Sequence, residues 1–368
     1  MNHYPSNVKE KLNSIILSMA EHHWLFSKNP GHDFTRQHLG KLSFYDTMRL
    51  IISMGKGRTN DEIMDYFDLD PDLIPSQSAF CQRRRQISLS AFEYLFSEFS
   101  SSFPSTTDKF KDHCILACDG CHVVYATNSD IIEDYNKPRL IDYKGYNHMH
   151  LNGFVDVISK AFLDVVIQPR QQPDEREALH SMLDHFTPDD PQKYIITADR
   201  GYESYDLLFH CELKNLGYVF RVKSPSSPKS ILSYYASELP DDLEEFDVTI
   251  KRFFTDKATN IMKSQSDVYR YINPSKNTPH FYELLRKNHS HLYFLQFRVV
   301  KIKTAENTYE YLITNLPFSF TLDDIQECYH WRWGIEISFR YLKHAAGLLY
   351  FHSKQPEFLK QEIYSCLI

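Results

Sequence analysis

Four side chains near the C-terminus have the types and the spacing to hold a metal ion and a phosphate. Tyr329, Arg332, Glu336 and Lys343 lie in the stretch CYHWRWGIEISFRYLK, with the spacing Y-x2-R-x3-E-x6-K. On a helix these offsets are close to whole numbers of turns, so the four side chains share one narrow stripe. A carboxylate between two cations and a phenol suits a metal ion that holds a phosphate. The alternative is a solvated charged helix face, which is what most such patterns are.

The same stretch carries a second stripe, which is apolar and has the three- and four-residue spacing of a buried helix face. Its members are Cys328, Trp331, Ile335, Phe339, Leu342 and Ala346. We therefore expect one continuous helix from Thr321 to Leu348, with Thr321 as its cap and two acids in its first turn. This helix buries its apolar edge and presents Glu336 on the other.

Two further acids each follow a short apolar segment of strand length. Asp119 comes directly after residues 114–118 (CILAC), and Asp199 comes directly after residues 194–198 (YIITA). An acid at the end of a buried strand is costly unless it is paired or binds a metal. Together with Glu336 these acids make a set of three carboxylates, which hard divalent ions such as Mg²⁺ or Mn²⁺ prefer.

These residues carry a resemblance to a known family. The motifs LACDG, TADRGY and Y-x2-R-x3-E-x6-K resemble those of bacterial DDE transposases of the insertion-sequence-four type, which are defined by a YREK signature. The stretches HLNGFVDVIS and FLDVVIQPRQQPDEREAL, between the first two acids, are also similar to that family. The resemblance extends from about Leu42 to the end of the chain.

The resemblance implies an enzyme that cleaves and joins DNA strands. Carried over by position, Asp119, Asp199 and Glu336 are the catalytic and metal-binding triad, with two Mg²⁺ (or Mn²⁺) ions as cofactors. The DNA-binding residues carried over are Tyr329, Arg332, Lys343 and, on the same stripe, Arg340. Members of the family hydrolyse DNA at transposon ends and then transfer the strand into a target. The implied partners are transposon-end and target DNA, and a homodimer in a synaptic complex.

The order of the predicted elements favours an α/β fold, because strands alternate with helices between residues 112 and 223. The expected strands are residues 114–118, 121–126, 150–158, 161–168, 193–198 and 217–223, and the expected helices are residues 174–186 and 203–215. The resemblance implies a ribonuclease-H-like core, a mixed five-stranded sheet with helices on both faces. In that fold the first acid lies on the central strand, the second follows the fourth strand, and the third lies on a later helix.

The chain is expected to have three parts. Residues 1–108 form a helical N-terminal DNA-binding domain, residues 109–224 and 305–368 the catalytic core, and residues 225–304 a β-rich insertion. In the first part, Asn60 and Ser76 are expected to begin two short helices. The second of these helices presents Arg83, Arg84 and Arg85 to a DNA groove. The alternative for this part is a helical bundle with a solvated basic face.

The net charge of −7 is unusual for a DNA-binding protein, but the charges are segregated along the chain. Residues 238–247 hold six acids and no base. Residues 248–303 hold eleven Lys and Arg residues against three acids. We therefore expect the insertion to offer a basic surface to DNA, with residues such as Arg270, Arg298 and Lys301.

Composition argues against a membrane or secreted protein. No apolar run approaches the roughly 20 residues that cross a bilayer, and the N-terminus lacks a small-residue cleavage site after an apolar block. The seven cysteines follow no regular framework, which favours a reducing cytoplasm. With the resemblance, the expected location is the bacterial cytoplasm, in association with the nucleoid.

Cysteines and histidines crowd around Asp119, and such residues at short spacing can bind zinc. They are His113, Cys114, Cys118, Cys121 and His122. Alternation along a strand sends successive side chains to opposite faces of a sheet, however. Buried strand cysteines are therefore the preferred interpretation.

Relatives continue past the signature helix, whereas this chain stops at Ile368 within a predicted helix. A truncated, noncatalytic remnant that competes for transposon ends is therefore the alternative to an active transposase. A third interpretation is a ribonuclease-H-like nuclease with a cellular role, which would cut DNA without joining it.

Overall fold

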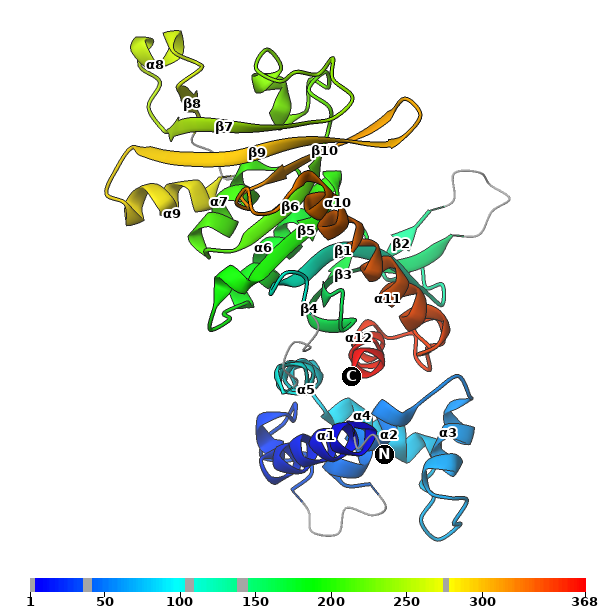
Figure 1. The fold of residues 1–368 in the computed structure, drawn as a ribbon. Coiled ribbons are helices and arrows are strands. Elements are labelled where there is room, and N and C mark those ends of the chain that lie inside the picture. The colour runs from blue at the N-terminus through cyan, green and yellow to red at the C-terminus, as the bar shows by residue number, and fades with distance from the viewer. Residues whose placement is uncertain (1–3, 36–41, 103–108, 138–144, 274–277) are drawn as a thin grey trace.

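The protein is a mixed α/β structure built on one ten-stranded sheet (Figure 1). The computed structural model describes residues 4–35, 42–102, 109–137, 145–273 and 278–368. None of the helices in these ranges combines the length and the hydropathy that a bilayer-crossing segment requires. The expected domain limit at residue 108 lies outside the described residues.

Five strands form the half of the sheet that positions the acids, in the order β4-β3-β1-β5-β6. They are β1 (Cys114–Tyr125), β3 (Tyr146–Asp156), β4 (Ala161–Pro169), β5 (Tyr194–Ala198) and β6 (Gly217–Val222). Strand β3 is antiparallel to both of its neighbours, whereas β1, β5 and β6 are parallel. A two-residue strand, β2 (Tyr135–Asn136), also pairs with β3. This is the expected ribonuclease-H-like arrangement with β1 at its centre, and the predicted fold class is confirmed.

One strand boundary was wrong, and it concerns the first acid. We expected separate strands at 114–118 and 121–126, but β1 runs unbroken from Cys114 to Tyr125, and Asp119 pairs with Gly153 of β3 inside it. Gly120 permits this close pairing, because a side chain at that position would overlap the imidazole of His150 on β3. The other strands in this half differ from expectation at their ends by four residues or fewer.

The second half of the sheet continues from β6 in the order β10-β9-β7-β8. These strands are β10 (Thr308–Thr314), β9 (Leu292–Ala305), β7 (Phe246–Thr255) and β8 (Tyr269–Tyr271). Two helices, α8 (Asn260–Ser264) and α9 (Pro279–Lys287), lie between the strands along the chain. The stretch 225–304 is therefore rich in strands and extends the central sheet rather than folding away from it (Figure 1).

The acidic run neutralises much of the basic run that follows it. Arg252 pairs with Glu238, Arg298 with Asp247, Lys301 with Asp241, and Lys303 with Glu244. Arg298 and Lys301 are only 3% and 4% exposed. The expectation that these two residues face DNA was wrong. Arg298 of β9 pairs with Asp247 of the neighbouring strand β7, and Lys301 of β9 pairs with Asp241, which precedes β7.

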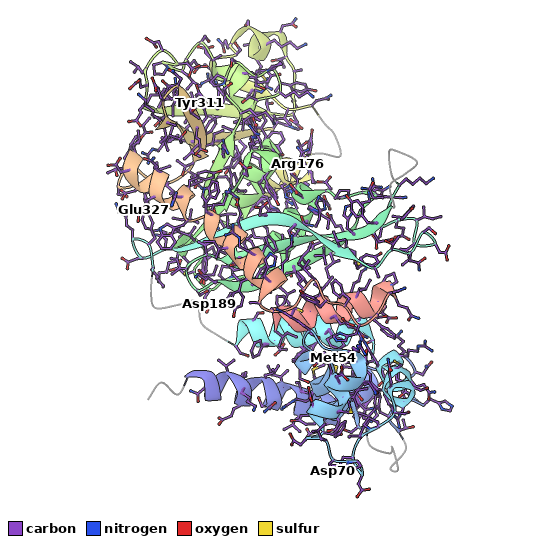
Figure 2. All side chains as sticks on the ribbon, turned by 90° about the vertical axis from the view of Figure 1, so that its right-hand side faces the viewer. Met54, Asp70, Arg176, Asp189, Tyr311 and Glu327 are labelled. Atoms are coloured by element: carbon purple, nitrogen blue, oxygen red, sulfur yellow. The ribbon has the colours of Figure 1, made fainter. Side chains whose placement is uncertain are left out.

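Helices cover both faces of the sheet. On one face, α6 (Glu175–His185), α7 (Tyr205–Leu213) and α9 pack over the strands in one buried apolar cluster. On the other face a second cluster joins α10 (Leu322–His330), α11 (Trp333–His344) and α12 (Pro356–Leu367) to the N-terminal helices. Figure 2 shows the two ends of the molecule, with Asp70 on the N-terminal helical layer and Tyr311 in the far half of the sheet.

The N-terminal helical layer consists of α1 (Tyr4–Glu21), α2 (Phe44–Ser53), α3 (Thr59–Tyr66), α4 (Gln77–Gln86) and α5 (Leu89–Ser101). Ser76 caps α4 as expected, by accepting a hydrogen bond from the backbone N–H of Ala79. Asn60 does not cap α3, because that helix already begins at Thr59. Apolar side chains of the layer belong to the same buried cluster as the sheet residues Ile115 and Val300.

The expected continuous helix from Thr321 to Leu348 is two helices, α10 and α11, and that prediction was wrong. Between them the backbone N–H groups of Arg332, Gly334 and Ile335 bond three residues back rather than four, which tightens the turn. Glycine has the weakest helix propensity apart from proline, and here it lets the chain approach Val157, whose carbonyl oxygen would lie 3.2 Å from an added Cβ. The break leaves Trp331 39% exposed, so it does not join the apolar stripe.

Arg84 of α4 is buried and contacts three residues of α12. Its guanidinium lies 2.7 Å from Glu362 Oε1. It also donates hydrogen bonds to Gln361 Oε1 at 2.9 Å and to the Phe358 carbonyl oxygen at 2.7 Å. Arg84 is only 3% exposed. The expectation that Arg84 enters a DNA groove was therefore wrong, since its donors are used inside the protein. Arg85 is exposed and Arg83 is partly buried on the same helix.

Replacing Arg84 by Met should lower the free energy of unfolding by about 3–5 kcal/mol, because Glu362 would remain buried without its cation. Arg85→Met is the matched control, since this neighbour is exposed, and it should change stability by less than about 0.5 kcal/mol. Denaturant unfolding of both variants measures the difference. Equal, small losses in the two would contradict the role of Arg84.

The same carboxylate should make stability depend on pH through His352. Glu362 Oε2 lies 3.2 Å from His352 Nδ1, and this hydrogen bond raises the pKa of the imidazole against the effect of burial. Because the pKa of His352 is higher in the folded state, its protonated form stabilises the folded protein. This stabilisation is complete below the unfolded-state pKa of about 6.5, and it is lost as the pH rises through the folded-state pKa. The stability difference between the wild type and His352→Gln should therefore be largest near about pH 6 and shrink above it. A difference that grows with pH would be inconsistent with this pairing.

Candidate active site

The parallel pairing of β1 with β5 brings the first two acids to the same edge of the sheet. Cys118 on β1 lies opposite Ala198 on β5, and each of these residues is followed directly by an acid. Asp119 continues β1, whereas Asp199 leaves β5 and caps the short 3-10 helix η3 (Arg200–Tyr202). Two acids that are eighty positions apart in the sequence therefore occupy equivalent positions on neighbouring strands.

Arg332 joins the third acid to the first. It is the N-cap residue of α11, a helix that packs against β1. One nitrogen of its guanidinium, Nη1, lies 3.3 Å from Asp119 Oδ2, and Nη2 lies 3.0 Å from Glu336 Oε1, one helical turn along α11. The guanidinium is 5% exposed, and its Nε has no hydrogen-bond partner among the described residues. A single buried cation thus faces two of the three predicted acids.

Asp199 is held by a phenol and a second arginine. The Tyr329 hydroxyl donates to Asp199 Oδ1 at 3.3 Å, and Arg221 Nη1 from β6 lies 3.4 Å from the same oxygen. Arg221 also pairs with Glu310 on β10 at 3.2 Å. The Tyr329 residue is only 4% exposed. Tyr329 and Arg332, which the resemblance assigns to DNA, therefore contact the acids in this structure.

Burial is the largest influence on the Asp119 carboxyl, and charges of both signs act on it. Burial raises the pKa of the Asp119 carboxyl, and the nearby charges of Glu175 and Glu336 add to this rise. The Gly120 N–H and the Arg332 cation act in the opposite direction. Burial also opposes the charge on Arg332, yet Tyr329 and Asp119 hold its pKa above the ordinary value. Burial thus disfavours the charged form of Asp119, and a cation beside this carboxylate would favour that form.

Three residues of this region were not predicted as site residues. Two of them are Glu175, at the start of α6, and His150, on β3. Glu175 Oε1 lies 3.1 Å from His150 Nε2, but the angles are not those of a hydrogen bond. The charge of Glu175 also raises the pKa of Asp119. Arg221 completes the set. Glu175 lies within a stretch that resembles the family, but no spacing in the sequence marks it. Arg221 lies in an apolar strand that gives no signal of its contact.

The other predicted site residues are more loosely connected to the acids. Lys343 on α11 lies beside Cys121 of β1, and its charge opposes the burial that raises the pKa of that thiol to about 11. Arg340 is exposed on α11. Arg83 and Arg85 lie on α4 in the N-terminal helical layer, apart from β1 (Figure 1).

The zinc alternative around Asp119 is not supported. Cys118 belongs to the apolar cluster on one face of the sheet and Cys121 to the cluster on the other. Strand alternation therefore separates them, as anticipated. In the part of the chain that the structure describes, none of these cysteines belongs to a group with metal-ligand spacing.

The three acids fit a hard divalent ion by their chemistry. They offer carboxylate oxygens, which Mg²⁺ and Mn²⁺ prefer. Among the described residues their oxygens do not all lie within 4.8 Å of one another. The acids are instead gathered around Arg332 and Tyr329, two residues that lie close in sequence to Glu336.

Comparison with known proteins identifies one family. Residues 110–368 match the family described as "Transposase DDE domain". A solved structure, the piggyBac transposase synaptic complex with hairpin DNA, is similar at a TM-score of 0.44 and 10% sequence identity. The similar region covers 87% of this chain and 62% of that one, so this chain spans less than two thirds of its length. No curated protein sequence gives a significant match.

Replacing Arg332 by Gln should change the response to Mg²⁺. Without the ion, we expect a loss of about 1–3 kcal/mol in the free energy of unfolding, because a charged hydrogen-bond partner of two acids is removed. Added Mg²⁺ should then raise the melting temperature of the variant more than that of the wild type, since a cation that repels the ion is gone.

The matched control is Arg340→Gln, which removes an exposed cation from the same helix. This variant should keep the wild-type stability and the wild-type response to Mg²⁺. Thermal unfolding with and without Mg²⁺ measures both quantities. An identical Mg²⁺ response in the wild type and Arg332→Gln would show that the acids around Arg332 do not bind the ion.

Proposed function

This chain belongs to the transposase DDE family, and we propose that it is an active enzyme of the insertion-sequence-four type with the YREK signature. In this proposal it hydrolyses phosphodiester bonds at transposon ends and transfers the freed strand into target DNA. One observation carries the proposal. Asp119 and Asp199 follow paired residues of parallel strands, and the tight turn at Arg332 brings Glu336 to the same guanidinium that contacts Asp119.

We propose that Asp119, Asp199 and Glu336 hold two Mg²⁺ or Mn²⁺ ions. When bound, such ions neutralise charge on the phosphate and lower the barrier for attack by water or a 3′-hydroxyl. Asp119 lies on β1, Asp199 directly follows β5, and Glu336 lies on α11. In the proposed reaction the attacking and leaving oxygens lie in line at the phosphate.

The remaining residues of the site position these acids. Arg332 fixes the carboxylates of Asp119 and Glu336 relative to each other through its two terminal nitrogens. Tyr329 and Arg221 both contact Oδ1 of Asp199, which leaves its Oδ2 free of these two contacts. Rigid elements with fixed partners keep the acids oriented before substrate arrives, which is how such sites gain much of their rate.

DNA is proposed to lie along the exposed side of α11. Lys343 and Arg340 lie on this helix beyond Glu336, where each can bind a backbone phosphate. Arg83 and Arg85 of the N-terminal layer are proposed as a second contact, now without Arg84. We keep residues 1–108 as the proposed DNA-binding domain, residues 109–224 and 305–368 as the catalytic core, and residues 225–304 as the insertion.

A homodimer on paired transposon ends remains part of the proposal, as does a location with the bacterial nucleoid. The alternative is a noncatalytic remnant that binds transposon ends and competes for them. A nuclease that cuts without joining is the third possibility. These alternatives differ in which DNA products they form, so one set of reactions separates them.

The test uses DNA ends that flank the reading frame, together with Mg²⁺ or Mn²⁺ and a target plasmid. We expect cleavage and strand-transfer products from the wild type. Asp119→Asn, Asp199→Asn and Glu336→Gln should each reduce cleavage by about 10³-fold or more, because each removes a ligand of ions that stabilise the transition state by several kcal/mol. DNA binding should remain within a few-fold of the wild type, as an electrophoretic shift would show.

Glu327→Gln is the matched control for Glu336. It removes an acid from the same segment at an exposed position of α10 and should leave cleavage unchanged. Binding without cleavage by the wild type would support the remnant instead. Cleavage without any joined product would support the nuclease. Full activity of the Asp119→Asn variant would refute the proposed site.

A further inference from the structure

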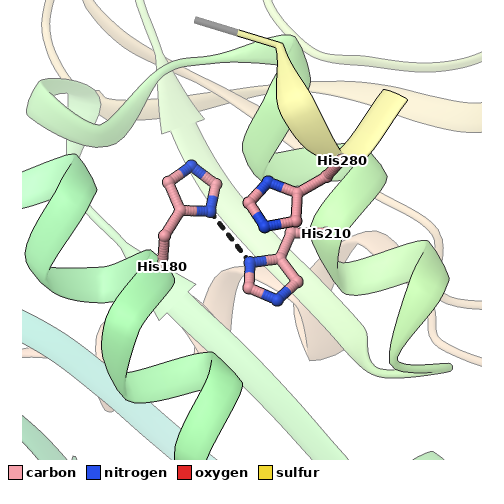
Figure 3. A group of neighbouring side chains, drawn as sticks. All are labelled: His180, His210 and His280. Atoms are coloured by element: carbon pink, nitrogen blue, oxygen red, sulfur yellow. Dashed lines mark hydrogen bonds between the residues drawn. The ribbon is translucent and has the colours of Figure 1, made fainter. Parts of the chain in front are cut away.

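Three histidines from separate helices meet on the face of the sheet opposite α11. His180 lies on α6, His210 on α7 and His280 on α9 (Figure 3). Each offers a ring nitrogen, and these atoms all lie within 4.8 Å of one another. His210 is fully buried, and the side chains of His180 and His280 are 12% and 13% exposed.

The rings face one another closely. His210 and His280 stack with ring centroids 3.8 Å apart, and His180 lies 4.5 Å from His280. The Nδ1 atoms of His180 and His210 are 2.8 Å apart. At most one of these two nitrogens can carry the proton of such a contact, so at least one presents a lone pair. The three ring planes lie within 10° to 15° of parallel, so the rings would tilt out of this stack to direct their lone pairs at one ion. Apolar packing alone does not require three ring nitrogens to gather within 4.8 Å of one another.

Carboxylates stand behind the three rings. Asp206 Oδ2 lies 2.7 Å from His280 Nδ1 and 3.7 Å from His180 Nε2. Asp184 Oδ1 lies 3.2 Å from His210 Nε2. An acid thus faces one nitrogen of each ring. The Nδ1 atoms of His180 and His210 contact each other in this structure, and a bound ion would replace that contact. A carboxylate behind each histidine is the usual arrangement around protein-bound zinc, where it fixes the tautomer and the ring orientation.

We propose that His180, His210 and His280 form a binding site for a transition-metal ion of the zinc class. Imidazole is a ligand that Zn²⁺ and similar ions favour, whereas Mg²⁺ favours oxygen. The site is therefore chemically distinct from the carboxylates around Arg332. Burial lowers the pKa of His180 to about 4, and the neutral imidazole is the form that binds a metal ion.

The ion would fasten α9 to the central fold. Asp206 of α7 already accepts hydrogen bonds from the backbone N–H groups of His280 and Phe281 at the start of α9. A bound ion adds a connection from α9 to both α6 and α7. Because α9 precedes β9 and lies within residues 225–304, the ion would hold this segment against α6 and α7, which pack over the sheet.

The test is a titration of the full chain, stripped of metal, with Co²⁺ and then with Zn²⁺ in excess Mg²⁺. Mg²⁺ occupies carboxylate sites, so the titration reports on nitrogen ligands. We expect one equivalent of Co²⁺ to bind, with visible absorption bands that Zn²⁺ displaces. We also expect Zn²⁺ to raise the melting temperature by several degrees, since an ion that binds only the folded state stabilises it.

Two variants and two controls locate the site. His280→Gln and His180→Gln should weaken binding by at least about tenfold, because each removes a ligand. His185→Gln changes an exposed histidine on the same helix as His180, and His122→Gln changes a histidine beside the acids. Both controls should bind one equivalent as the wild type does.

The wild-type titration alone can overturn the proposal, even if a variant fails to fold. Absence of saturable binding near one equivalent would show that the three histidines only stack. Binding that His122→Gln abolishes, and that His280→Gln leaves unchanged, would place the ion elsewhere. Neither outcome depends on whether the chain cleaves DNA, so this proposal and the proposed function can fail separately.

Discussion

The structure of the candidate site depends on one buried cation between acids from distant parts of the chain. Parallel pairing of β1 with β5 places Asp119 beside Asp199, but it does not bring Glu336 to them. Arg332 does so, because its two terminal nitrogens contact Asp119 and Glu336 together. Positive charge between two carboxylates offsets their mutual repulsion. Arg332 lies in the tight turn between α10 and α11, one helical turn before Glu336, and from there it contacts both carboxylates.

Charge is segregated within the fold, so the net charge of the chain does not describe each part of its surface. The acids of residues 238–247 are paired with Arg252, Arg298, Lys301 and Lys303 in the far half of the sheet, so much of the charge there is balanced internally. On α11, the helix that carries Glu336, Arg340 is exposed and Lys343 is partly buried. Net charge therefore says little about where nucleic acid could bind this protein, whereas the pairing of individual residues says much.

Local apolar patterning in the sequence predicts the alternation of strands and helices and the buried segments that contain or precede Asp119 and Asp199, whereas the mixed five-stranded sheet is what the family resemblance implies. The sequence could not predict contacts that arise only when distant elements pack. Arg84 looked like a groove-facing arginine because its partner Glu362 is far along the chain. Glu175 and Arg221 gave no signal for the same reason. The break near Gly334 was missed because its cause is contact with Val157 on another element, not a local helix-stopping motif.

The central claim is that Asp119, Asp199 and Glu336 surround one metal site. Fe²⁺ can replace Mg²⁺ at such sites, and with a reductant and peroxide it generates radicals that cut the nearby backbone. With Zn²⁺ present to hold the histidine cluster, fragments should end near residues 119, 199 and 336, and excess Mg²⁺ should suppress all three cuts together. Cuts near only one of these positions, or cuts that Mg²⁺ leaves unchanged, would contradict a shared site.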